Sequence, residues 1–209
     1  MLIKLSAISG QLSALIAFSI IFHLPALAQK HELAFTVGRV LSSERNSQQG
    51  ALDLGTGTAV QVNYAYRLID GGAAALYGEV HFLASPLRDI SAGIPTATRD
   101  FATLYLTPGL RLKFLPGARV SPYVVVGGGY ALYEQSTQTI GNQPNPAARR
   151  INRAALDYGG GVDVKVLRFL SLRGEIRDFY TGSPSYNVPF VSGGQHNVVA
   201  GGGVVLQLR

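Results

Sequence analysis

Apolar and polar residues alternate along most of this chain, in eight stretches that together fill residues 32–209. The clearest stretch is 101–114, where Leu104, Leu106 and Leu110 occupy even positions and Thr103 and Arg111 occupy odd ones. A helix would scatter these residues around its circumference, whereas a strand separates them onto two faces. The alternation therefore predicts eight β-strands, at residues 33–40, 57–68, 74–83, 101–114, 122–134, 154–166, 169–180 and 196–209.

The connectors between these strands alternate between long and short. The short ones are tight turns, of which the first contains Asp70-Gly71, a strong hairpin signal because both residues tolerate positive φ. The long ones are polar and rich in Gly, Pro, Asn and Ser, and cover residues 41–56, 84–100, 135–152 and 181–195. Short turns on one rim and long loops on the other are typical of an up-and-down transmembrane β-barrel. The predicted fold class is therefore all-β, an eight-stranded antiparallel up-and-down transmembrane barrel.

Residues 1–28 form a separate segment. Lys4 is the only charged residue before His23, and residues 12–22 are an apolar run that is shorter than the ~20 residues a membrane-spanning helix needs. Small residues follow at Ala26 and Ala28. This pattern predicts a cleaved secretory signal peptide over residues 1–28 and a single barrel domain over residues 29–209.

The alternation alone leaves two interpretations open, since a soluble barrel also has one apolar and one polar face. In a membrane barrel the charged face would line the interior and its members would pair there. Mixed charge signs on that face favour the membrane, as does a charged fraction of 14% against ~25% in soluble domains. The predicted interior charge network consists of Glu79, Arg111, Asp163, Lys165, Arg173, Glu175 and Arg177.

Aromatic residues near the predicted strand ends also favour the membrane, because interfacial girdles of a membrane barrel require them there. Those residues are Phe35, Tyr66, Phe82, Phe114, Tyr123, Tyr133, Phe169 and Tyr180. Eight strands enclose too little space for a wide pore, because side chains fill the interior of such a barrel. A general diffusion porin is therefore not expected.

Three segments resemble the small outer-membrane barrel proteins of the OmpA and OmpX type. Residues 121–130 (SPYVVVGGGY) are similar to their fifth strand, and residues 159–165 with 170–177 are similar to the hairpin of their sixth and seventh strands. The resemblance implies an outer-membrane location, with the long loops outward and both termini in the periplasm. It also implies outer-membrane lipid, lipopolysaccharide and the outer-membrane assembly machinery as partners.

Catalytic and cofactor motifs are not found in the sequence. None of the three Gly triplets fits G-x-G-x-x-G, and the histidines lack metal-ligand spacing. Glu79 and His81 share one strand face, an arrangement more typical of a hydrogen-bonded structural pair than of catalysis. Lipid A deacylases of this barrel type carry His-x-Ser on a late strand, but here His196 is followed by Asn197 and Val198. We therefore expect no catalytic residue, no metal and no cofactor.

The net charge of +6 is spread along the chain rather than clustered, so a nucleic-acid partner is not expected. The sequence predicts a non-enzymatic outer-membrane barrel with a structural or surface-interaction role, in which the four long loops carry recognition of a partner. Two alternatives remain at this point. One is a soluble periplasmic or secreted barrel that binds an apolar ligand, and the other is a lipid-A-modifying barrel enzyme.

Overall fold

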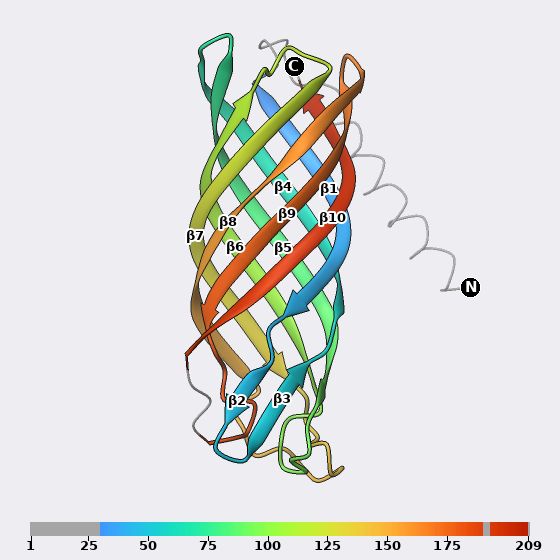
Figure 1. Ribbon diagram of the computed structural model, residues 1–209, viewed down its shortest axis with the longest axis vertical. Coiled ribbons are helices and arrows are strands. Elements are labelled where there is room, and N and C mark those ends of the chain that lie inside the picture. Colours follow the sequence, from blue (N-terminus) through green and yellow to red (C-terminus); the bar gives the residue numbers. More distant parts are fainter. Residues whose placement is uncertain (1–29, 190–192, 209) are drawn as a thin grey trace, which may run out of the picture.

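The computed structural model describes residues 30–189 and 193–208, and the predicted signal peptide lies outside them. Eight long antiparallel strands wind around a common axis in this part of the chain (Figure 1). They are β1 (His31–Ser42), β4 (Gly57–Asp70), β5 (Ala74–Ser91), β6 (Asp100–Phe114), β7 (Val120–Gln135), β8 (Arg150–Leu167), β9 (Leu170–Gly182) and β10 (Gly194–Leu208). Two short strands, β2 (Arg45–Ser47) and β3 (Gly50–Leu54), form an additional hairpin.

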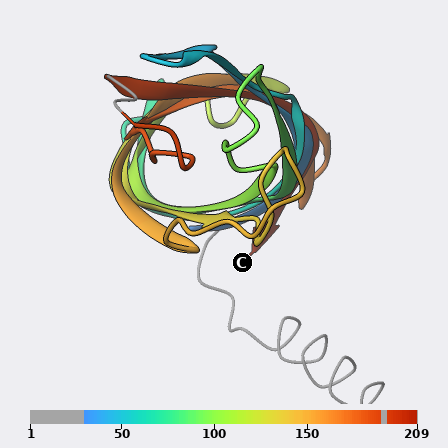
Figure 2. The same ribbon diagram turned by 90° about the horizontal axis from the view of Figure 1, so that it is seen from below.

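The sheet closes on itself. Strand β1 pairs with both β4 and β10, and the remaining strands pair in chain order, including β5 with β6. Seen along its axis, the molecule is a ring of strands (Figure 2). Closure leaves no long strand with an unpaired edge. The predicted eight-stranded antiparallel barrel is confirmed.

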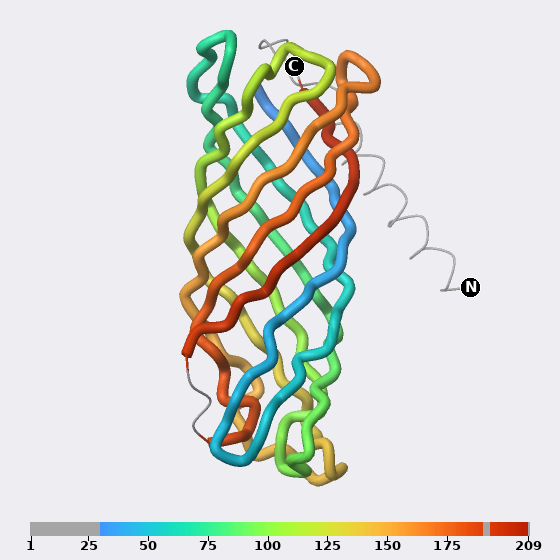
Figure 3. The backbone as a smooth tube through the Cα atoms, viewed as in Figure 1, coloured from blue at the N-terminus to red at the C-terminus, as the bar shows by residue number. Residues whose placement is uncertain are grey.

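The three short turns lie at one end of the barrel, together with the C-terminal end of β10 (Figure 3). The long connectors and the β2–β3 hairpin lie at the other end. All eight strands are inclined to the barrel axis, as closure of an eight-stranded sheet requires (Figure 3).

The strands reach further toward the long-loop end than the sequence indicated. The predicted connector 84–100 is wrong in its first half, because β5 continues to Ser91 and pairs with β6 as far as Asp100. Pro86 lies in this predicted connector, and in the structure it falls within a register shift between Ser85 and Arg88, where a bulge tolerates proline. The predicted connector 41–56 likewise contains the hairpin β2–β3 rather than an unstructured loop.

The interior is polar and the outer wall is apolar over most of the barrel. Among the most exposed apolar side chains are Val37, Val126 and Ile176, each about 60% exposed, whereas Arg111 and Arg177 are at most 1% exposed. A soluble barrel would place these residues the other way round. The arrangement is that of a membrane barrel. No helix in the described part of the chain is long and apolar enough to cross a bilayer.

The aromatic residues predicted for a girdle are only partly where the prediction placed them, because two of them point inward and Phe82 lies in the middle of β5 rather than near a strand end. Tyr123 and Tyr133 are buried inside the barrel, because they share the inward face of β7 with Val125 and Ala131. Tyr66 is half-buried beside the His31 ring. The other members have exposed side chains on the outer wall: Phe35, Phe82, Phe114, Phe169 and Tyr180.

Two glycines of the triplets show why these positions are glycine. A Cβ on Gly161 would lie 2.6 Å from the Tyr123 hydroxyl, and a Cβ on Gly203 would meet the backbone oxygen of Phe35. Glycine at position 161 therefore makes room for the large, inward-facing Tyr123 side chain. Glycine at position 203 allows the β1 backbone to approach closely.

Candidate functional site

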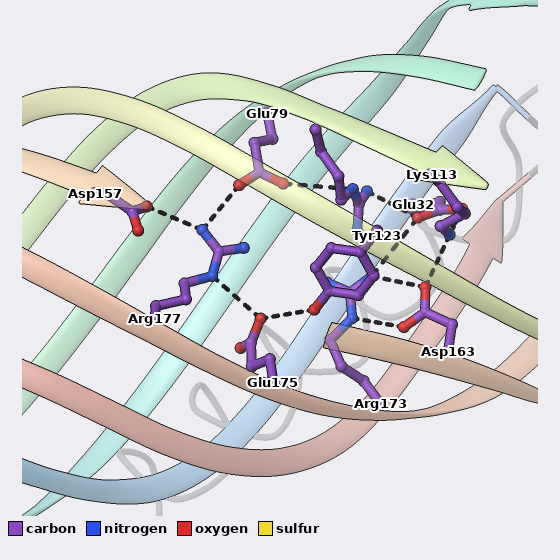
Figure 4. Close-up of polar contacts among 10 residues, drawn as sticks. Glu32, Glu79, Lys113, Tyr123, Asp157, Asp163, Arg173, Glu175 and Arg177 are labelled. Atoms are coloured by element: carbon purple, nitrogen blue, oxygen red, sulfur yellow. Dashed lines mark hydrogen bonds and ion pairs between the residues drawn. The ribbon is translucent and has the colours of Figure 1, made fainter. Parts of the chain in front are cut away.

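The lumen is filled by two chemically different groups of side chains. The half next to the short turns holds nine charged residues, which we call the charge network (Figure 4). All nine are buried in the barrel interior. They are Glu32, Glu79, Arg111, Lys113, Asp157, Asp163, Arg173, Glu175 and Arg177.

Arg177 on β9 is the centre of one part of this network. Its Nη1 lies 2.9 Å from Glu79 Oε1 and 2.9 Å from Asp157 Oδ2, and its Nε lies 3.1 Å from Glu175 Oε2. Glu79 belongs to β5, which is not a neighbour of β9 in the sheet. The guanidinium therefore crosses the lumen and binds three carboxylates from three strands.

The other part of the network joins β1, β6, β8 and β9. Glu32 accepts from Arg111 Nη2 at 2.8 Å and from Lys113 Nζ at 2.6 Å. Lys113 also lies 2.8 Å from Asp163, which receives two parallel bonds from Arg173 at 2.8 and 2.9 Å. Such a bidentate arginine–carboxylate pair fixes geometry as well as charge.

Neutral groups complete the network. The Tyr123 hydroxyl donates to Glu175 Oε2 at 2.9 Å, and the Thr36 hydroxyl donates to Glu175 Oε1 at 3.0 Å. The guanidinium groups of Arg111 and Arg173 lie over the Tyr123 ring at 5.4 and 4.7 Å from its centroid. The buried tyrosine that was expected in the girdle is therefore a partner of the interior charges.

The structure brings together six of the seven residues that the sequence singled out for the interior, as the ion pairs above show. The prediction was wrong for Lys165, whose Nζ donates to the Gly117 carbonyl at 3.3 Å in a short turn. Three members, Glu32, Lys113 and Asp157, were not among the seven predicted residues. Lys113 and Asp157 have the inward parity of their strands, which was the available signal, whereas Glu32 precedes the expected start of the first strand.

Glu79 and His81 do not form the structural pair that their spacing indicated. Glu79 binds arginines, and the ring of His81 instead lies 3.1 Å from Gln61 Oε1 through its Nε2. The two residues face the same lumen but have separate partners. Their arrangement gives no acid–base pair.

The half of the lumen next to the long loops contains aromatic and aliphatic side chains, which we call the mouth plug. Rings from strands and loops pack together, with centroids 4.8 Å apart for Tyr105 and Phe179 and 5.1 Å apart for Phe101 and Tyr186. The plug comprises Leu52, Leu54, Leu83, Ile90, Ile94, Phe101, Tyr105, Tyr133, Phe179, Tyr186 and Val188. It resembles the core of a soluble protein placed inside the barrel end.

Arg88 fastens the β3 segment to this plug. It is buried, and its Nη2 donates to the Leu54 carbonyl at 3.0 Å and to Ser42 Oγ at 2.6 Å. Its guanidinium also lies 4.9 Å from the centroid of Phe101. Arg88 was not among the predicted site residues, because it fell in a predicted connector.

The connectors themselves lie across the barrel opening (Figure 2). The Asn187 side chain donates to the Thr96 carbonyl at 2.7 Å, and the Thr98 amide donates to the Tyr186 carbonyl at 2.9 Å. Burial raises the pKa of the Tyr186 hydroxyl well above its usual value. The hydroxyl therefore stays protonated and donates to Gln195 Oε1 at 2.8 Å.

The geometry of the lumen is that of a packed interior. Its ionised groups are engaged with one another. Within residues 30–189 and 193–208, no group of three or more histidine, aspartate or glutamate side chains is arranged to hold a metal ion. The interior therefore supports assembly and stability of the barrel.

Comparison with known proteins places this fold. The family described as "Outer membrane protein beta-barrel domain" matches residues 14–202. The crystal structure of Neisserial surface protein A is similar with a TM-score of 0.54 and 14% identity, over 87% of this chain and 98% of that chain. The outer membrane protein OprG from Pseudomonas aeruginosa is similar with a TM-score of 0.52 and 12% identity, over 85% of this chain and 95% of that chain. No curated protein sequence matches significantly.

The family match covers most of the chain, and the closed barrel with an apolar outer wall agrees with it. The outer membrane is therefore its location. This chain belongs to the family of the outer membrane protein beta-barrel domain.

Proposed function

We propose that this protein is a non-enzymatic outer-membrane barrel that acts as a surface-interaction protein, with its long connectors carrying the recognition. The observation that supports this most is the filling of the lumen. Paired charges occupy the half next to the short turns, which we place in the periplasm. The mouth plug occupies the half next to the long connectors, which we place at the cell surface. Described side chains thus fill much of the interior, and the outer wall faces lipid, so the connectors remain as the accessible surface.

The described parts of the surface connectors are held in place rather than hanging from the rim. Arg45 donates to the Gly194 carbonyl, which fastens the β2–β3 hairpin to β10. The Asn145 side chain donates to Thr98 Oγ1 at 3.0 Å, which joins two further connectors. A surface that is ordered before it meets a partner loses less conformational entropy on binding. This supports a recognition role for connectors 41–56, 84–100, 135–152 and 181–195.

The other proposed partners follow from location. The exposed apolar wall fits the acyl chains of outer-membrane lipid and lipopolysaccharide, and a barrel of this kind needs an assembly machinery to reach the membrane. We infer no catalytic role. In particular, the lumen residues bind one another, and position 198, where the deacylase pattern needs serine, is Val198.

The proposal is tested with loop variants on intact cells. Replacing the exposed tip of the β2–β3 hairpin, residues 47–50, and residues 141–147 with short Gly-Ser turns removes surface without removing plug side chains. We expect a folded, heat-resistant barrel that has lost binding to host-cell or matrix surfaces. A matched control replaces the short turn 115–118, on the periplasmic side. Unchanged surface binding by every loop variant would contradict the proposed role.

Proteolysis checks which end carries the accessible surface. Protease added outside intact cells should cut the connectors at the surface and spare the turns at residues 71–73, 115–119 and 168–169, because those turns lie in the periplasm. Opening the outer membrane should make the turns accessible. Cleavage of the turns in intact cells, with the long connectors untouched, would reverse the orientation and remove the basis of the proposal.

A further inference from the structure

A polar cluster lies on the outer wall of the barrel, on the side away from the charge network. Asp178 on β9 accepts from the Tyr158 hydroxyl at 2.7 Å and lies 2.6 Å from His196 Nδ1, both through Oδ2. Its Oδ1 accepts from the Asn197 amide at 3.2 Å. The side chain of His196 is 49% exposed, and Tyr158 is 44% exposed. Asp178 is therefore held in place while its neighbours face outward.

The neighbours of this cluster along β9 show how deep it lies in the apolar band of the outer wall. Strand β9 presents exposed Leu172 and Ile176 on the periplasmic side of Asp178, and Tyr180 on its cell-surface side. An interfacial tyrosine marks the edge of the apolar band. Asp178 therefore lies near the outer edge of that band, at the level where the polar groups of outer-leaflet lipids meet their acyl chains.

An arginine lies on the same face. Arg39 on β1 is exposed, and its register partner on β10 is Ala200, which in turn is opposite Ile176 on β9. Two strand spacings separate β1 from β9, which amounts to about 10 Å. Among the described residues, no acidic side chain lies within ion-pair distance of Arg39. A lipid-facing cation without an acidic partner is unfavourable unless a polar lipid group satisfies it.

A hollow lies between these two sites. It is a wide, open depression with a volume of about 410 Å³ on three neighbouring strands, and its lining includes Glu175 beside Gly160, Gly174, Ile176, Ala200 and Gly201. The register places Ile176 between Gly160 and Ala200, directly next to the cluster on the periplasmic side. The floor of the hollow is apolar and starts where the polar groups end. Its shape suits an acyl chain whose polar end reaches Asp178, His196 and Arg39.

We propose that this wall, formed by β1, β8, β9 and β10, binds one molecule of lipid A, the acylated and phosphorylated glycolipid of lipopolysaccharide. Arg39 binds a phosphate group, while Asp178 and His196 accept and donate hydrogen bonds to the amide and hydroxyl groups at the roots of the acyl chains. One acyl chain fills the hollow. The combination of a cation with a carboxylate and an imidazole favours lipid A over a free phosphate, because Asp178 can accept hydrogen bonds from amide and hydroxyl groups but not from a phosphate anion. This inference rests on the lipopolysaccharide contact of the proposed function, and the site does not involve the surface connectors.

Three variants test the site in the folded barrel. Arg39→Gln removes the cation, and Asp178→Asn removes the carboxylate charge while keeping its shape. Gly174→Leu fills the hollow, and its new Cβ meets nothing within 4 Å, so the backbone is not strained. The matched controls are Arg168→Gln, an exposed arginine at the periplasmic end, and Gly128→Leu, where a Cβ lies 3.8 Å from its nearest neighbours on another part of the wall.

The measurement is retention of added lipid A by protein in phosphatidylcholine nanodiscs, read by native mass spectrometry, with circular dichroism to confirm folding. We expect the protein to keep one lipid A molecule. Arg39→Gln and Asp178→Asn should bind it about tenfold more weakly or worse, as for loss of a charge-assisted bond. Gly174→Leu should bind it more weakly by a similar factor, because its side chain occupies the hollow. The two controls should bind like the parent. Equal retention by all variants would overturn the proposal, as would displacement of lipid A by equimolar phosphatidylethanolamine or phosphatidylglycerol.

Discussion

The charge network and the mouth plug fill the two ends of one lumen by different physical means. In the network, side chains at most a few per cent exposed carry full charges, and they are stable only because opposite charges, most of them from other strands, reach them. In the plug, rings and aliphatic groups need only apolar neighbours, several of which come from connectors. The network is thus fixed by strand register, whereas the plug depends on how the connectors fold back.

This difference predicts different consequences of damage. A missing partner in the network leaves a buried charge without compensation, which affects the whole barrel. A missing ring in the plug leaves a cavity, which should destabilise the connectors that pack on the plug more than the strands. The following experiments separate these two behaviours, beginning with the largest expected effect.

Arg177→Met should be the most destabilising of these changes. It removes the guanidinium from Glu79, Asp157 and Glu175 at once, and breaking a buried pair in this way costs about 3–5 kcal/mol. Urea unfolding of the barrel in vesicles measures the loss. Arg150→Met, which changes an exposed arginine at the barrel rim, is the control and should change the unfolding free energy by less than about 0.5 kcal/mol. Similar unfolding of both variants would show that the network does not stabilise the barrel.

Phe101→Ala should loosen the plug and spare the network. Removing a buried ring of this size costs about 3 kcal/mol where the surroundings cannot collapse. Amide hydrogen exchange should rise in residues 92–99 and 183–189, which pack on the plug, but not in the strands around Arg177. Phe114→Ala, on the outward face of the same strand, serves as the control. Faster exchange throughout the barrel would mean that the two halves unfold together.

Tyr186→Phe should have the smallest effect, about 1 kcal/mol, because it removes one hydrogen bond to Gln195 and keeps the ring. It also tests a pH dependence. Burial raises the pKa of Tyr186 above that of an exposed tyrosine, about 10, so its contribution is present below pH 10 and is lost as the pH rises further. Exchange in residues 183–189 should therefore increase above pH 10 in the parent, and less so in Tyr186→Phe. An identical pH response in both proteins would exclude this tyrosine as the cause.

Local pattern was enough to predict much of this protein. The two-residue period along strands such as 101–114 predicted eight strands and one polar face, which carries six members of the charge network. The mixed charge signs and the low charged fraction favoured placing that face inside. The alternation of connector lengths predicted the up-and-down order, and the resemblance in residues 121–130 and 159–177 pointed to the outer membrane. These features follow from rules that act over a few residues, so one sequence contains them.

Partners and boundaries were decided only by the tertiary structure. Parity places Arg111 inside, but the closure of β1 against β4 and β10 brings Glu32 to it from 79 positions away. Lys165 belongs to a polar face, yet its place beside a short turn takes it out of the network. Tyr123 and Tyr133 were predicted for the girdle because they are aromatic residues near strand ends, but both lie on the inward face of β7. Register and closure couple residues far apart in the chain, and no local period specifies which of them meet.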